Sequence, residues 1–135
     1  MYPGDDPVHV ETPAGIIGLT ICYDVRFPEL YRTLVDTGAT LFTVPAAFTV
    51  PTGKAHWQTL LRARAIENLS YVVAAGQVGE HPDNRATYGH SMIVGPWGDI
   101  LGELESGNGF VAADIDSELV ARLRRDAPVL ANRRL

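Results

Sequence analysis

Several residue types are scarce in this sequence, and their scarcity narrows the choice of structure and function. Its 135 residues include one cysteine, Cys22, so no disulfide can form within the chain and a cytoplasmic location is expected. No run approaches the ~18 consecutive apolar residues of a membrane span. The first twenty residues lack the basic and apolar regions of a signal peptide, so we expect no membrane as a partner.

Positive charge is scarce as well. Eleven Lys and Arg against sixteen Asp and Glu give a net charge of −5, with no basic cluster interleaved with aromatic residues. A nucleic-acid partner is therefore not expected. The four histidines are too scattered, and too short of carboxylate or thiol partners, to predict a metal site, and no cofactor is indicated.

The cysteine lies where an apolar strand, residues 16–21, is predicted to give way to a helix over residues 27–37. At the carboxyl end of a strand in an α/β sheet, side chains face the crevice where ligands bind. A thiol at Cys22 can attack a carbonyl carbon there, and the backbone N–H of Tyr23 can bind the resulting oxyanion. Position alone fits equally well a small buried side chain, which is a common role of free cysteine.

The remaining pattern predicts an α/β chain. A short edge strand at residues 8–11 forms a hairpin with the strand before Cys22. Two further helices and five further strands follow: strand 40–44, helix 54–69, strand 71–78, strands 91–94 and 99–104 as a hairpin, strand 109–114 and helix 117–125. The part up to residue 78 makes a β-α-β-α-β unit, which should cross over right-handed.

The string CYDVRFPELYR, which starts at Cys22, closely resembles the nucleophile segment of the carbon-nitrogen hydrolase (nitrilase) superfamily. Further matches follow in the expected order: PAAFTVPTGKAHWQTLLRARAIEN, TYGHSMIVGPWGDIL and APVLANRRL. Within the superfamily the chain is most similar to the Nit amidase branch, the group of deaminated-glutathione amidases and omega-amidases. The resemblance implies an α-β-β-α sandwich and hydrolysis of amides or nitriles through a cysteine thioester. It also implies a Glu as general base and a Lys that stabilises the tetrahedral intermediate.

In that family the Glu and the Lys precede the cysteine, whereas here only 21 residues come before Cys22 and they contain neither motif. Lys54, the one lysine, follows the cysteine, and Glu11 and Glu29 lie in the wrong segments. The general base and the catalytic lysine are therefore expected to be absent from this chain. We expect residues 1–135 to form a single partial domain, the C-terminal half of the four-layer sandwich, truncated at its amino end.

Half of such a sandwich has one sheet with its helices on one side. The other side would expose more apolar area than the few hundred Å² that soluble monomers usually tolerate. We therefore expect the chain to form a homo-oligomer or to bind a complementing N-terminal half.

Three further positions are candidates for binding a substrate at the same edge of the sheet. The guanidinium of Arg26 suits a substrate carboxylate, although an ion pair with Asp24 or Glu29 is the favoured interpretation. Ala47 and Phe48 follow the second strand, so they either shape the pocket or form an ordinary connection.

His90 precedes a later strand and has the pKa range of a base for Cys22, but a position in the pocket wall is the preferred interpretation. Arg64 and Glu67 can pair along the long helix, while Arg62 does not share their face. We interpret these three as an ion network at a helix or subunit contact.

The resemblance makes a small-molecule amide the expected substrate. The expected activity is that of an omega-amidase, which acts on deaminated glutathione or an α-keto acid omega-amide and releases ammonia. An inactive, truncated or partner-dependent subunit would also fit the residues present. So would hydrolysis of a nitrile or a carbamoyl compound within the same superfamily, or a cysteine hydrolase with a Cys-His pair.

Overall fold

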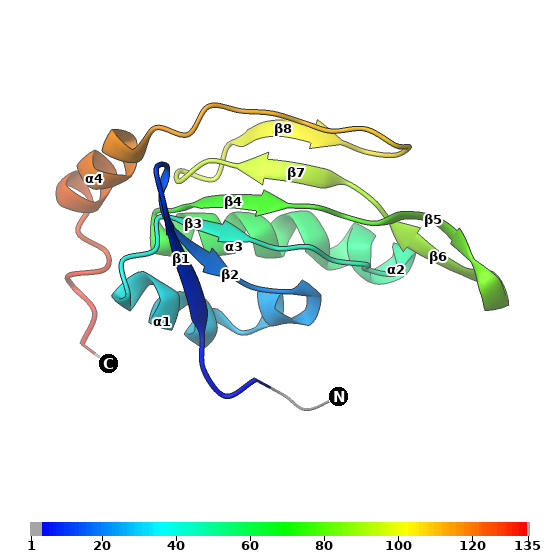
Figure 1. Cartoon of the computed structure of the whole chain (residues 1–135), viewed down its shortest axis with the longest axis horizontal. Coiled ribbons are helices and arrows are strands. Elements are labelled where there is room, and N and C mark those ends of the chain that lie inside the picture. Colours follow the sequence, from blue (N-terminus) through cyan, green and yellow to red (C-terminus); the bar gives the residue numbers. More distant parts are fainter. Residues whose placement is uncertain (1–3, 135) are drawn as a thin grey trace.

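A six-stranded sheet forms the centre of the computed structural model, which describes residues 4–134 (Figure 1). Its order is β1-β2-β3-β4-β7-β8, in which β2, β3 and β4 run parallel and the other neighbours antiparallel. The strands are β1 (Val8–Thr12), β2 (Gly15–Leu19), β3 (Leu41–Thr43), β4 (Tyr71–Ala74), β7 (Ser91–Val94) and β8 (Ile100–Leu104). The α/β class, the hairpin and the edge position of β1 are confirmed.

Two helices, α1 (Pro28–Asp36) and α3 (Gln58–Asn68), pack on one face of this sheet. They bury the main core, in which Leu34 and Leu61 meet Phe42 of β3 and Val72 of β4. The helix expected over residues 54–69 begins earlier, with α2 (Val50–Thr52) and a π-helical turn, Gly53–Trp57, that leads into α3. No helix in the described part of the chain is both long and apolar enough to cross a bilayer.

The opposite face of the sheet carries a second, smaller core at one end. Leu41 and Tyr71 are cross-strand neighbours on this face, and Val120 of α4 (Ser117–Asp126) packs against them. The expectation that the helices lie on one side of the sheet is therefore wrong for α4. Successive side chains of a strand point to opposite faces, so the apolar residues alternating with Phe42 and Val72 need a cover of their own.

The part of that face formed by β1 and β2 is open. Val8, Val10 and Leu19 remain 55%, 43% and 42% exposed, and Val8 pairs directly with Leu19 across β1 and β2. We call these three residues the open sheet face. Apolar side chains are therefore exposed on this part of the sheet, while α4 covers its other end.

Two of the expected strands differ in the structure. The strand predicted over residues 71–78 ends at Ala74, and the chain then leaves the sheet for a separate hairpin of β5 (Val78–His81) and β6 (Arg85–Tyr88). The strand predicted over residues 109–114 does not form. In that segment Val111 lies over Gly102 of β8, but no ladder of backbone hydrogen bonds joins the two.

Candidate active site

Cys22 lies at the carboxyl end of the parallel strands, as predicted. After β2 ends, the N–H groups of Thr20 and Cys22 bond to the carbonyls of Thr43 and Pro45, at 3.1 and 2.8 Å. These bonds continue the alignment of β2 with β3 past the end of the sheet. Cys22 then starts a three-ten helix, Cys22–Arg26, with a φ of 50°. This left-handed conformation is uncommon for a residue other than glycine and turns the chain sharply out of the strand direction.

Cys22 is half-buried: the residue keeps part of its solvent exposure, and its side chain packs against the main core. The N–H of Tyr23 donates no hydrogen bond within residues 4–134, whereas the N–H of Asp24 bonds to the Ile21 carbonyl at 3.0 Å. Within the described residues, the cysteine is therefore followed by a backbone N–H without a hydrogen-bond partner, which is the kind of donor that an oxyanion site uses.

Arg26 does not form the ion pair that was favoured for it. The Asp24 carboxylate instead accepts a hydrogen bond from the N–H of Ile21 at 2.8 Å, and Arg26 has no carboxylate partner among the described residues. Its guanidinium lies between the rings of Tyr23 and Phe48, 5.4 and 5.3 Å from their centroids. Both terminal nitrogens of this half-buried cation also lie 3.4 Å from Nδ1 of His56.

The loop after β3 adjoins Cys22 through the Pro45 carbonyl, so the two strand ends meet as expected. Phe48 is buried and packs on Trp57, with ring centroids 4.8 Å apart. Ala47 is exposed and lines a cavity of about 280 Å³ with residues of β6. The Phe48 ring therefore contacts the guanidinium of Arg26, while Ala47 lines the cavity that it shares with residues of β6.

His90 contacts a carboxylate that sequence reasoning missed. Its Nδ1 lies 2.6 Å from Oε1 of Glu103 on β8, and its ring stacks on Tyr88 with centroids 4.0 Å apart. Its carbonyl accepts the indole N–H of Trp57 at 2.8 Å. No hydrogen bond joins an imidazole to Cys22 in the described part of the chain, so the alternative Cys-His pair is not formed.

No glutamate or lysine within residues 4–134 makes a hydrogen bond to the thiol of Cys22. Lys54 is exposed on the π-helical turn, and Glu67 is engaged by Arg64 at 2.8 Å, which confirms that predicted pair. Cys22 does not line any of five surface cavities formed by residues 4–134. Over the same residues, no group of three or more His, Cys, Asp or Glu is placed to hold a metal ion.

Sequence reasoning also missed the buried polar contacts beneath residues 20–25, the turn that contains Cys22. The hydroxyls of Thr20 and Tyr31 are 2.8 Å apart, and Arg64, which is 5% exposed, reaches the Val25 carbonyl. Burial raises the pKa of Tyr31 to about 12. The available signal was a single arginine, Arg64, among the apolar positions of a helix that packs on a sheet.

Comparison with known proteins places this geometry among related chains. A family model described as carbon-nitrogen hydrolase matches residues 1–125. Deaminated glutathione amidase of Bos taurus is 54% identical over 125 residues, which cover 93% of this chain and 38% of the relative.

Two solved structures extend the comparison. The Caenorhabditis elegans NitFhit protein superposes with a TM-score of 0.90 at 50% identity, over 98% of this chain and 32% of the other. Saccharomyces cerevisiae Nit3, a member of branch 10 of the nitrilase superfamily, gives 0.91 at 35% identity, over 100% of this chain and 50% of the other. The chain spans half or less of each of these relatives.

Proposed function

The chain belongs to the carbon-nitrogen hydrolase family, and we propose that it supplies the nucleophile of an amidase acting on a small linear amide. The observation that carries the proposal is Cys22 itself. It is a half-buried thiol at the end of a parallel strand, held at a φ of 50° beside the unpaired N–H of Tyr23. Those are the requirements for attack on a carbonyl carbon with an oxyanion site alongside.

The proposed reaction has two steps. A general base takes the proton of Cys22, the thiolate adds to the amide carbon, and the developing oxyanion is held by the N–H of Tyr23. The C–N bond then breaks, and ammonia leaves with the transferred proton. Water next adds to the thioester and releases the carboxylic acid and the free thiol. A glutamate base and a lysine cation, outside residues 4–134, complete the site in this proposal.

Arg26 favours an amide that also carries a carboxylate. Its guanidinium is half-buried and lacks a carboxylate partner within residues 4–134, and such a group binds both oxygens of an acid at once. We therefore propose an omega-amide of a dicarboxylate, such as deaminated glutathione or an α-keto acid omega-amide. The amidase similarity of the Bos taurus relative supports this choice.

The second candidate is a subunit that hydrolyses its substrate only together with a partner chain, or that has no catalytic activity. It is favoured because no acid or base is hydrogen-bonded to the thiol of Cys22 among the described residues. In this interpretation a complementing N-terminal half supplies the missing walls of the pocket.

The test is ammonia release from omega-amides, measured with the chain alone and with a complementing N-terminal half of a relative. We expect activity in the complemented sample, and its loss in Cys22→Ala with folding retained. Neutral amides of equal length and the matching nitriles serve as controls for the substrate class. Activity that survives Cys22→Ala contradicts the proposed nucleophile. If neither sample releases ammonia although the complex is folded, the second candidate is favoured.

A further inference from the structure

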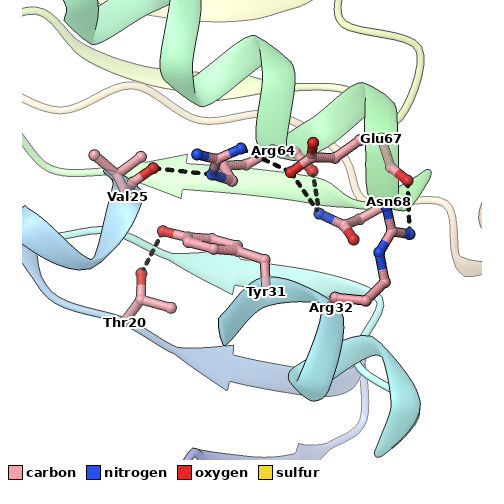
Figure 2. Close-up of polar contacts among 7 residues, drawn as sticks. All are labelled: Thr20, Val25, Tyr31, Arg32, Arg64, Glu67 and Asn68. Atoms are coloured by element: carbon pink, nitrogen blue, oxygen red, sulfur yellow. Dashed lines mark hydrogen bonds and ion pairs between the residues drawn. The ribbon is translucent and has the colours of Figure 1, made fainter. Parts of the chain in front are cut away.

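Arg64 is a buried arginine that reaches residues 20–25, the turn that contains Cys22, from the helix side of the sheet (Figure 2). Arg64, on α3, is 5% exposed, and its Nε donates a hydrogen bond to the Val25 carbonyl at 2.9 Å. One of its terminal nitrogens donates to Oε1 of Glu67 at 2.8 Å. The guanidinium thereby ties α3 to the three-ten helix that starts at Cys22.

A buried tyrosine holds the same turn from the other end. The Tyr31 hydroxyl, on α1, lies 2.8 Å from Oγ1 of Thr20, and Thr20 donates its own proton to the Thr43 carbonyl at 2.8 Å. Tyr31 is therefore the donor to Thr20. Both side chains are buried, at 0% and 2% exposure, so water does not compete for these bonds.

The two contacts are connected and flank the cysteine. The Arg64 guanidinium lies over the Tyr31 ring, 5.5 Å from its centroid, in the arrangement of a cation-π contact. Thr20 comes two residues before Cys22, and Val25 comes three residues after it. The pair therefore fixes the backbone on both sides of the one residue in this turn with a positive φ.

Such a conformation persists only where the surroundings hold it. An arginine is also a costly way to fill a core, because its charge must be desolvated and its N–H groups satisfied. An apolar side chain would pack the same helix against the sheet. Besides its ion pair with Glu67, Arg64 contacts the backbone carbonyl of Val25 in the turn and the ring of Tyr31.

We propose that Arg64 and Tyr31 are positioning residues for the nucleophile. They hold residues 20–25 so that the sulfur of Cys22 and the N–H of Tyr23 keep their relative placement. The inference rests on the proposed function, because a positioning role requires that Cys22 is the nucleophile. The contacts of Arg64 and Tyr31 themselves involve no substrate.

Amide hydrogen exchange of the chain tests this directly. The N–H groups of Cys22, Asp24 and Phe27 are all hydrogen-bonded, and the amides of the central strands β3 and β4 report on global stability. In Arg64→Gln we expect exchange at these three amides to rise about tenfold or more beyond the rise in β3 and β4, as for a lost hydrogen bond to a charged donor. An equal rise at all sites assigns Arg64 a general structural role and overturns the proposal.

Arg62→Gln is the matched control. It removes an arginine of the same helix whose Nε donates to the Gly98 carbonyl at 2.7 Å, away from the turn. We expect no local rise in the turn for this variant, and a rise equal to that of Arg64→Gln overturns the proposal. If Arg64→Gln does not fold, Tyr31→Phe carries the test, because it keeps the ring and removes only the hydroxyl bond to Thr20.

Kinetics separate positioning from folding in a sample that releases ammonia. Arg64→Gln should lower kcat about tenfold with KM little changed, because a displaced nucleophile impairs the chemical step more than substrate binding. An unchanged kcat per folded molecule overturns the proposal. If no sample releases ammonia, the proposed function fails while the exchange experiment still decides the positioning role.

Discussion

The buried phenol of Tyr31 makes the free energy of unfolding of this chain fall at alkaline pH. Burial raises its pKa from 10.0 to about 12, so folding favours the neutral form. The stabilisation is complete below pH 10 and is lost as pH rises toward 12. A shift of two pKa units corresponds to about 3 kcal/mol.

Urea unfolding at several pH values between 8 and 12 measures this loss. Between pH 10 and 12 the unmodified chain should lose about 2 kcal/mol more than Tyr31→Phe, which cannot ionise at this position. Parallel curves for the two proteins would show that the phenol ionises as easily in the folded state as in the unfolded state.

Sequence spacing predicted the position of Cys22 but not the partners of Arg26. The spacing of Arg26 and Glu29 suggested a pair only if one helix continued through both. The three-ten helix instead ends at Arg26, and Phe27 is extended, with a φ of −108°. The two side chains therefore do not share a helix face. Side-chain pairs across such breaks depend on tertiary geometry that local spacing does not contain.

The contact between His90 and Glu103 was hidden for a related reason. The two residues lie on neighbouring segments, 13 positions apart in the sequence, and the antiparallel register of β7 and β8 brings them together. Their pairing follows from the register, which a β-bulge at Ile93 and Val94 also shifts. The hairpin itself was predictable from its turn residues.

At the scale of elements, the π-helical turn Gly53–Trp57 depends on its glycine. A Cβ at Gly53 would lie only 2.2 Å from Cγ of Tyr88, although the backbone there is ordinary helix. Two effects then oppose each other in Gly53→Ala. Alanine gains roughly 1 kcal/mol of helix propensity over glycine, whereas overpacking costs about 1–3 kcal/mol. The approach is too close for a small rotation of Tyr88 to relieve, so we expect net destabilisation.

Thermal unfolding of Gly53→Ala should show a lower Tm, and the Tyr88 and His90 ring signals should shift in NMR spectra because their stack is displaced. Gly4→Ala is the control, since a Cβ there has no neighbour within 4 Å. A Tm at or above that of the unmodified chain would mean that Tyr88 moves aside freely and that propensity prevails.

Helices and parallel strands were predictable because they carry strong periodic patterns. The α1 stripe and the apolar run of β3 each match one regular period, and the structure has both. Residues 109–114 are also mostly apolar and follow a Gly-Asn-Gly turn, yet they form no ladder, because a local pattern does not specify a hydrogen-bonding partner. The split of the strand predicted over residues 71–78 has the same origin, since β5 pairs with β6 outside the main sheet.

The whole molecule has two apolar sheet faces and a complete cover for one of them. α1 and α3 close the first, while α4 closes only the end of the second around Leu41 and Tyr71. Composition and the order of elements predicted a single main sheet with helices packed on it, but they placed all helices on one side and could not assign α4 to the opposite face. That assignment depends on which strand residues remain uncovered after α1 and α3 have packed.

The open sheet face, Val8, Val10 and Leu19, should drive self-association of the chain alone. Apolar side chains clustered on an edge strand favour pairing with another surface. Val8→Lys places a charge on this face, while His9→Lys places the same charge on the opposite face of the same strand.

Sedimentation velocity should show oligomers for the unmodified chain and for His9→Lys, and smaller species for Val8→Lys. Because Val8 is 55% exposed, the Tm of Val8→Lys should remain close to that of the unmodified chain. A monodisperse monomer that melts cooperatively without substitution would show that the open sheet face needs no partner.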